Sequence, residues 1–341
     1  MKAWRVYGTN DMRLDDIPIP EAKPGWLLAR SIAFQPSITE IQRLWGVSQR
    51  GLENMDTTIQ TTGPFCLGHE VCAIVEDIID DGDIQKGDRI TYFHQKGMVC
   101  GSDYSGCFAE YYLLPVSSAF KMNPAIPDIE GPALQPFSSC IRAVKEANVS
   151  IGDRVAIFGQ GVMGLNITQL CHLAGASLVI GLDVREQCLA VAKQLGADVT
   201  VNASQQNAVQ AIKEITQGKG VDVAFECASG STEVGLSGGK TIFEAIEVLA
   251  VSGRLVQIAF FHDKISLDLN KLRFKNLKYI FPEEAYREDT DLGINLVAQG
   301  KVKFSPYITH TLQGIEKLPE AIEITAYKGK YNAINPTVVI V

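Results

Sequence analysis

The sequence predicts an α/β protein of two domains, one of which contains a doubly wound parallel sheet. Three observations carry this prediction: the chain length, an alternation of strands and helices after Asp153, and a glycine-rich turn at the start of that alternation. A chain of 341 residues is long enough for two domains, each with its own core. Apolar residues make up 46% and charged residues 21%, which is typical of a globular protein and argues against a disordered one.

The overall charge excludes some classes of partner. A net charge of -8 argues against nucleic acid or an anionic membrane, because phosphate binding needs a basic surface. No apolar run approaches the roughly 20 residues that a membrane helix needs. The first residues also lack the basic and then apolar design of a secretion signal, so we expect a cytoplasmic protein. The eight cysteines form no CxxC pair, and we expect them to be mostly buried free thiols.

The first 135 residues are expected to form short strands and turns, because helical periodicity is weak there. "VCAIVEDI" (71–78) and "FAEYYLLP" (108–115) are typical of strands, whereas "QKGDRI" (85–90) is typical of a turn. After residue 281 we expect two helices, around 292–300 and 315–329, and a final strand at 337–341.

Between these parts the pattern predicts a parallel sheet, because strands that alternate with helices are typical of βαβ units. The expected strands are 154–159, 178–184, 199–202, 221–228 and 254–261, with 277–281 as a further edge, and the expected helices are 162–175, 186–197, 208–218 and 241–253.

A dinucleotide-binding turn is predicted where the first of these strands meets the first helix. Gly159, Gly161 and Gly164 are spaced as G-x-G-x-x-G in that context. Gly159 allows a tight turn, Gly161 allows close approach of a pyrophosphate, and Gly164 allows the helix to pack on the strand. The N–H groups of the first helical residues, Val162 and Met163, are then free to bind phosphate.

Asp183 ends the next expected strand, 19 residues after Gly164. A carboxylate at this place accepts hydrogen bonds from the adenosine ribose hydroxyls and repels the 2′-phosphate of NADP. We therefore expect NAD as the cofactor. The nearby Arg185 is a second candidate cofactor-binding residue, and it leaves NADP open as an alternative.

Several segments, taken in order, resemble the medium-chain dehydrogenase/reductase superfamily in its zinc-type alcohol and polyol dehydrogenase branch. The resemblance covers nearly the whole chain. It implies a GroES-like, mostly-β catalytic domain of residues 1–135, completed by 285–341, and a Rossmann NAD-binding domain at 136–284. The segments that carry it are "MKAWRVYG", "LGHE", "KGDRI", "GCFAEYYLLP", "IGDRVAIFGQGVMG", "AKQLGAD" and "VDVAFECASG".

The resemblance also implies catalytic residues, because zinc-type members hold a catalytic zinc through a cysteine, a histidine and a further acidic or cysteine ligand. Alignment on Gly46 places Ser37 at the cysteine position, Thr39 at the position of a proton-relaying hydroxyl, and Glu40 at an aspartate. His69 matches the histidine ligand, and Glu70 its neighbour.

This chain departs from the zinc pattern at two ligand positions. Ser37 replaces the cysteine, Gln135 replaces the further ligand, and the four-cysteine structural-zinc loop is missing. Neutral hydroxyl and amide groups are poorer zinc ligands than thiolate and carboxylate. We therefore expect His69 and Glu70, if they hold a metal at all, to hold it weakly. A shifted alignment would bring in Cys66, Cys100 or His94 instead.

Without zinc, another group must stabilise the oxygen of the alcohol or carbonyl substrate. The candidates are Ser37, Thr39 and a protonated His69 paired with Glu70, while Tyr92 and His94 lie in a segment that could reach the cleft.

Three functions stay open at this point. The first is an NAD-dependent oxidoreductase of a secondary alcohol, a polyol or a sugar-derived substrate, active as a homodimer or homotetramer. The second is a zinc-free reductase of quinones or activated alkenes. The third is a catalytically inactive NAD-binding protein, because fold alone does not decide function.

Overall fold

The chain folds into two compact units, and each is described here by itself. The computed structural model describes residues 1–341 except 48–58, 61, 81, 94–97, 231–236 and 262–263. Unit 1 comprises Met1–Ser138 and Ala285–Val341, and unit 2 comprises Ser139–Glu284. The boundary at Ser138 falls inside helix α3 (Leu134–Glu146).

Unit 2 is built on a six-stranded sheet in the order β10-β9-β8-β11-β12-β13, with every neighbouring pair parallel. This order reverses between β8 and β11, as in a doubly wound fold, and it confirms the predicted parallel sheet. The strands are β8 (Arg154–Phe158), β9 (Leu178–Asp183), β10 (Val199–Asn202), β11 (Val221–Glu226), β12 (Leu249–Gln257) and β13 (Lys278–Ile280).

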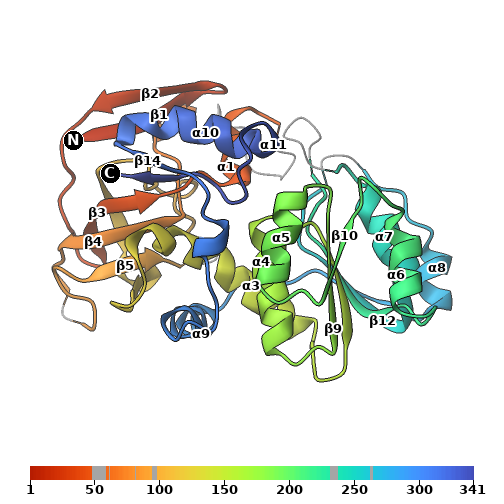
Figure 1. Cartoon of the computed structure of the whole chain (residues 1–341). Coiled ribbons are helices and arrows are strands. Elements are labelled where there is room, and N and C mark those ends of the chain that lie inside the picture. The colour runs from red at the N-terminus through yellow and green to blue at the C-terminus, as the bar shows by residue number, and fades with distance from the viewer. Residues whose placement is uncertain (48–58, 61, 81, 94–97, 231–236, 262–263) are drawn as a thin grey trace. The chain divides into compact units, whose positions relative to one another are not determined.

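Helices cover both faces of this sheet. Figure 1 shows α4 and α5 on one face and α6 and α7 on the other. Apolar side chains such as Ile180, Leu182, Ile212 and Ile246 meet between the sheet and the helices and form a continuous core. The helices are α4 (Val162–Leu173), α5 (Glu186–Gln194), α6 (Ala208–Ile215), α7 (Lys240–Val248) and the short α8 (Leu269–Phe274).

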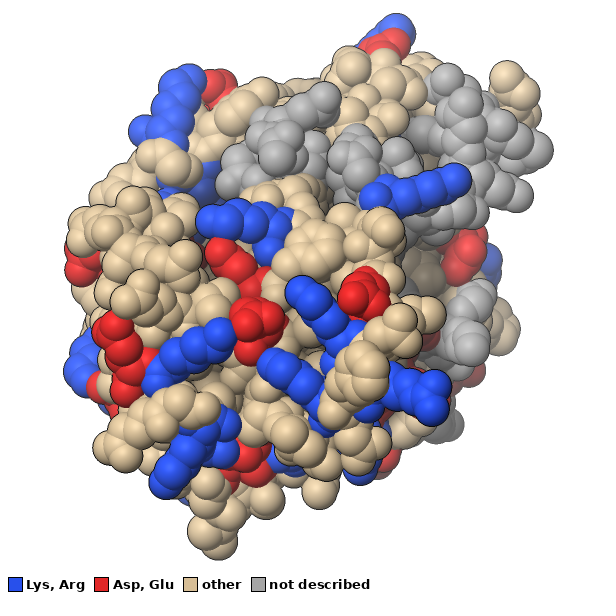
Figure 2. Space-filling model, turned by 90° about the vertical axis from the view of Figure 1, so that its right-hand side faces the viewer, with Lys and Arg blue, Asp and Glu red and all other residues tan. Residues whose placement is uncertain are grey.

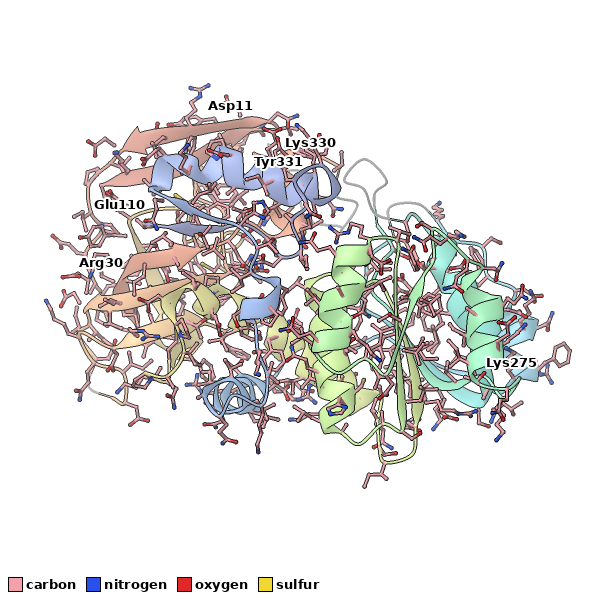
Figure 3. All side chains as sticks on the ribbon, in the orientation of Figure 1. Asp11, Arg30, Glu110, Lys275, Lys330 and Tyr331 are labelled. Atoms are coloured by element: carbon pink, nitrogen blue, oxygen red, sulfur yellow. The ribbon has the colours of Figure 1, made fainter. Side chains whose placement is uncertain are left out.

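The prediction of one helix over 241–253 was wrong at its C-terminal end. Helix α7 ends at Val248, and β12 begins at the next residue, Leu249. Tertiary contacts explain the early end. The Lys275 ammonium, labelled in Figure 3, donates to the carbonyls of Ile246, Glu247 and Leu249 at 2.8 to 3.0 Å. A cation at the carbonyl end of a helix satisfies acceptors that a further helical turn would otherwise use.

Unit 1 is mostly β-structure around a seven-stranded sheet. The strand order is β14-β15-β3-β4-β5-β7, and β6 pairs with the N-terminal half of β3. The first two strands, β1 and β2, form a separate two-stranded antiparallel sheet. The strands are β1 (Lys2–Gly8), β2 (Asp11–Asp16), β3 (Trp26–Phe34), β4 (Val71–Asp77), β5 (Arg89–Tyr92), β6 (Tyr111–Pro115), β7 (Ala119–Lys121), β14 (Thr311–Gln313) and β15 (Val338–Ile340).

The helices of unit 1 include α9 (Arg287–Ala298), α10 (Leu318–Ala326) and α11 (Lys328–Tyr331), which match the two helical regions predicted in the tail. Helix α1 (Ile38–Leu44), in contrast, lies in a part where only strands and turns were expected. Its start is fixed by a capping box: the Glu40 N–H donates to Ser37 Oγ, and the Ser37 N–H donates to the Glu40 carboxylate.

The remaining bulk expectations can be compared with the structure. All eight cysteines are free thiols, and only Cys227 is partly exposed. Among the described residues, no helix is both long and apolar enough to cross a membrane. The face of the molecule in Figure 2 carries acidic and basic side chains interspersed over its described part.

Candidate functional site

The glycine-rich turn in unit 2 needs glycine at two of its three positions for reasons internal to the fold. Gly159 has φ +93°, where other residues are strained, and a Cβ there would lie 3.0 Å from the backbone of Cys227. A Cβ on Gly164 would lie 1.8 Å from the Gly159 carbonyl oxygen. These two glycines therefore allow the turn to form and the helix to pack closely on β8.

Gly161 differs, because a Cβ at this position would meet no atom within 4 Å. It is the N-cap of α4, and it has no side chain that could accept a hydrogen bond from the first turn of that helix. The N–H groups of Val162 and Met163 have no acceptor within the helix, since the first turn of any helix leaves its donors free. The space beside Gly161 is thus a place where a phosphate could meet backbone donors and the positive end of the helix.

Asp183 lies at the end of β9, next to this turn. Its Oδ2 accepts from the Gln160 N–H at 2.8 Å, and its Oδ1 accepts from the Arg185 N–H at 2.9 Å. The Arg185 Nε lies 3.7 Å from the same Oδ1. A carboxylate has about four acceptor positions, so the two backbone contacts leave capacity for two ribose hydroxyls. The fold therefore fixes the orientation of the Asp183 carboxylate without using all of its hydrogen-bond acceptor positions.

Glu226 is a further carboxylate at the end of a strand, and it was not predicted. It ends β11, which pairs with β8 on the side opposite to β9. It is fully buried, and its Oε1 accepts from the Ala228 and Ser229 N–H groups and from Thr241 Oγ1. Its Oε2 accepts no hydrogen bond from the described residues. Burial raises the pKa of this carboxyl against the effect of those donors. Glu226 thus ties the loop after β11 to the first turn of α7.

In unit 1 the structure brings His69 and Glu40 together. Nδ1 of His69 lies 2.9 Å from Oε1 of Glu40, an ion-pair distance, although the angle is not that of a good hydrogen bond. Burial alone would lower the pKa of His69, but the charge and contact of Glu40 outweigh it and the pKa is raised. The ion pair within the described residues uses Nδ1, which leaves Nε2 as the nitrogen that could meet a ligand.

Glu70 has a different partner from the one expected. The sequence suggested that Glu70 pairs with its neighbour His69, but Glu70 Oε2 accepts from Gln35 Nε2 at 2.5 Å. His69 and Glu70 are the last two residues before strand β4, and their side chains have different partners, Glu40 and Gln35. Burial raises the pKa of Glu70 to about 7, while the His69 charge and the Gln35 hydrogen bond oppose the shift.

Ser37 and Thr39, both predicted to act on the substrate, lie at the start of α1. Ser37 is nearly buried, and its hydroxyl caps the helix through Glu40. Thr39 is half-buried in the first turn, and no contact joins it to His69. Helix α1 therefore places Glu40, rather than either hydroxyl, directly against the histidine.

Tyr92, the other described candidate, lies on β5 and is fully buried. Its hydroxyl accepts from the Cys100 N–H at 3.1 Å, and its ring centroid is 6.3 Å from that of His69. These contacts indicate that Tyr92 packs near His69 and supports the backbone at Cys100. His94 lies outside the described residues.

Two family models match the chain, one on each side of the boundary at Ser138. A model for the alcohol dehydrogenase GroES-like domain matches residues 43–127, and a model for zinc-binding dehydrogenases matches residues 162–288. Curated relatives match over almost the full length. An NAD-dependent alcohol dehydrogenase of Sulfurisphaera tokodaii is 28% identical, over 95% of this chain and 96% of its own. An L-threonine 3-dehydrogenase of Pyrococcus abyssi is 26% identical, over 95% and 94%.

The chain is a medium-chain dehydrogenase/reductase of the zinc-type alcohol and polyol dehydrogenase branch. The solved structures agree. A zinc-binding dehydrogenase of Sinorhizobium meliloti bound to NADP superposes with a TM-score of 0.86 at 25% identity, covering 100% of this chain and 99% of that one. A 2R,3R-butanediol dehydrogenase of Bacillus subtilis shares the fold, with a TM-score of 0.83, 21% identity and coverage of 100% and 99%.

This membership confirms three predictions: the family, the combination of a GroES-like and a Rossmann-like fold, and an NAD(P)-dependent oxidoreductase of the alcohol dehydrogenase type. The catalytic zinc of the family needs a set of protein ligands. Among the described residues, no group of three or more His, Cys, Asp or Glu side chains could hold a metal ion. The hydroxyl of Ser37, which the resemblance aligns with a cysteine ligand, is engaged in capping α1. The described donor set of this medium-chain dehydrogenase therefore does not fit a catalytic zinc.

Sequence reasoning missed Glu226 and Gln35 and did not predict the contact of Glu40 with His69; the places of Glu40 and Glu226 had a readable signal. The Ser37-x-x-Glu40 spacing is a capping box, which predicts a helix start and thereby the place of Glu40. Glu226 closes a parallel strand as Asp183 does, and polar groups at carboxyl ends of strands are typical of binding sites. Gln35 had no such signal, because its contact with Glu70 spans 35 residues.

Proposed function

We propose that this dehydrogenase uses NAD to move a hydride between the nicotinamide and a secondary alcohol or its ketone, with a polyol or a sugar-derived compound as the substrate. The observation that carries the proposal is the turn at Gly161 beside Asp183. The names of relatives support the substrate class, since they include an erythritol/L-threitol dehydrogenase and a probable D-xylulose reductase.

The preference for NAD rests on Asp183. This carboxylate is held by two backbone N–H groups and keeps acceptor capacity for the ribose hydroxyls. The 2′-phosphate of NADP would bring a second anion against it. Arg185 does not offset this repulsion well, because its Nε already faces Asp183 at 3.7 Å.

Bound NAD⁺ supplies the acceptor for the hydride that leaves the carbinol carbon. The chain must then take the hydroxyl proton, so that the C–O bond becomes a carbonyl. We assign this step to Nε2 of His69, because Nδ1 faces the Glu40 carboxylate at 2.9 Å. In the reverse direction the imidazolium gives the proton back, and Glu40 stabilises that charged form. Thr39 is the candidate for relaying the proton, and we propose that no zinc takes part.

The cofactor preference is tested by titrating NADH and NADPH against the full chain by fluorescence, with Asp183→Asn as the variant. This change keeps the size of the side chain but removes its charge. We expect NADH to bind at least about tenfold more tightly than NADPH to the wild type, since about two hydrogen bonds are lost and a repulsion is added. The variant should lose most of that ratio. Equal binding of both cofactors to the wild type would overturn the assignment of Asp183.

The metal prediction is tested by metal analysis of purified protein and by an NAD-linked activity screen over secondary alcohols, polyols and sugars. We expect well under one zinc per chain and an activity that survives a chelator. His69→Asn should abolish that activity, while His172→Asn on helix α4 of unit 2 serves as the matched control. Stoichiometric zinc that disappears in His69→Asn would instead restore a zinc mechanism.

A further inference from the structure

Unit 1 contains a cavity that shares no residue with the sites described above. Its volume is about 280 Å³. This volume is close to the lower end of small-molecule pockets, which begin at about 300 Å³. Aromatic, proline and aliphatic side chains make up most of its wall, which includes Met1, Lys23, Trp26, Tyr104 and Tyr111.

The aromatic wall is held in place by the fold. The rings of Trp26 and Tyr104 meet edge to face, with centroids 5.1 Å apart and planes at 89°. Trp26 begins strand β3 and exchanges two backbone hydrogen bonds with Lys23. Tyr104 belongs to a turn closed by the hydrogen bond from the Gly101 N–H to the Tyr104 carbonyl. Because both rings stand on fixed backbone, the cavity is preformed, which lowers the entropic cost of binding.

The charges at the cavity are unbalanced. The Lys23 ammonium lies 4.7 Å from the centroid of the Trp26 ring, and no carboxylate of the described residues pairs with it. The other cation, the Met1 ammonium, is already satisfied by Asp16 Oδ1 at 3.1 Å and the Ile17 carbonyl at 2.7 Å. No Asp or Glu lines the cavity. One positive charge is therefore left beside an apolar, aromatic space.

We propose that this cavity is a second ligand site, which binds a small aromatic or aliphatic carboxylate. The apolar part of the ligand lies against Trp26, Tyr104 and Tyr111, and its carboxylate pairs with Lys23. A cationic ligand would meet the Lys23 ammonium and no Asp or Glu in the wall. A neutral hydrocarbon would leave Lys23 unused. The charge of the wall thus selects an anion, and its surface selects an apolar body.

The test uses the full chain with saturating NAD, so that the cofactor site is occupied. The probe is 3-phenylpropanoate, with 3-phenylpropanamide as its neutral match, and binding is measured by calorimetry. We expect the acid to bind about fivefold more tightly than the amide, the size of effect that a partly exposed ion pair gives. Lys23→Gln should weaken the acid by a similar factor and leave the amide unchanged.

Lys86→Gln is the matched control, because Lys86 is another exposed lysine of unit 1 and does not line the cavity. It should bind the acid like the wild type. The location is checked by tryptophan fluorescence: the acid should quench the wild type, and Trp26→Phe should lose most of that quenching. The proposal is overturned if the acid does not bind at millimolar concentration. It is also overturned if acid and amide bind alike, if Lys23→Gln behaves as Lys86→Gln does, or if the quenching persists in Trp26→Phe.

Discussion

Replacing Gly161 by valine separates cofactor binding from folding, because the structure gives the new side chain room on the protein side. Gly161 has φ -76°, which any residue adopts, and an added Cβ meets no atom within 4 Å. The free energy of unfolding should therefore stay within about 0.5 kcal/mol of the wild type, as for an unstrained surface substitution. The isopropyl group would instead fill the space in front of the first N–H groups of α4.

The expected loss of affinity follows from those donors. A phosphate that accepts from the N–H groups of Val162 and Met163 makes two charge-assisted hydrogen bonds, each worth roughly 1.5 kcal/mol. Losing both amounts to about 3 kcal/mol, or roughly a 100-fold weaker binding of NADH. Fluorescence titration of NADH measures this loss, and thermal unfolding without cofactor measures stability.

Two further variants make the result interpretable. Gly329→Val places the same side chain on exposed helix α11, where an added Cβ also meets nothing within 4 Å, and it should leave NADH binding intact. Gly164→Ala should unfold or strongly destabilise unit 2, because its Cβ would lie 1.8 Å from the Gly159 carbonyl oxygen. If Gly161→Val binds NADH as tightly as the wild type does, the turn is not a phosphate site and the reasoning fails.

The remaining predictions concern unit 1. The folded pKa of Glu70 is about 7 against an ordinary 4.5, so the folded state holds its proton more tightly and the free energy of unfolding should fall as the pH rises from 4.5 to 7. In Glu70→Gln this part of the fall should disappear in urea unfolding series, and an unchanged slope would contradict the assignment. Ser37→Ala removes the cap of α1 and should cost about 1 kcal/mol of stability while leaving kcat within a few-fold. A large loss of kcat at unchanged stability would show that the hydroxyl acts on the substrate.

The sequence by itself determined the parallel sheet and the glycine-rich turn between β8 and α4, because the signals for both are local. A strand, its helix and the glycines between them lie within about 20 residues, and their periodicity reports directly on the backbone that they form. Asp183 could be predicted for the same reason, since the end of one strand fixes its place. The end of α7 at Val248 could not, because the Lys275 side chain that satisfies its last carbonyls is distant in sequence.

Only the tertiary structure decided which groups meet at the proposed catalytic histidine. The sequence places Glu70 beside His69, yet the two side chains have different partners. Gln35 contacts Glu70, and Glu40 reaches the imidazole from a helix 29 residues before His69. The carboxylate of Glu40 does two things at once: it accepts the Ser37 N–H that starts α1, and it faces Nδ1 of His69. A contact of this kind depends on where a helix packs against a strand. No periodicity within either element encodes that position. The residue types alone, in contrast, showed that a serine and a glutamine stand where the resemblance expects zinc ligands.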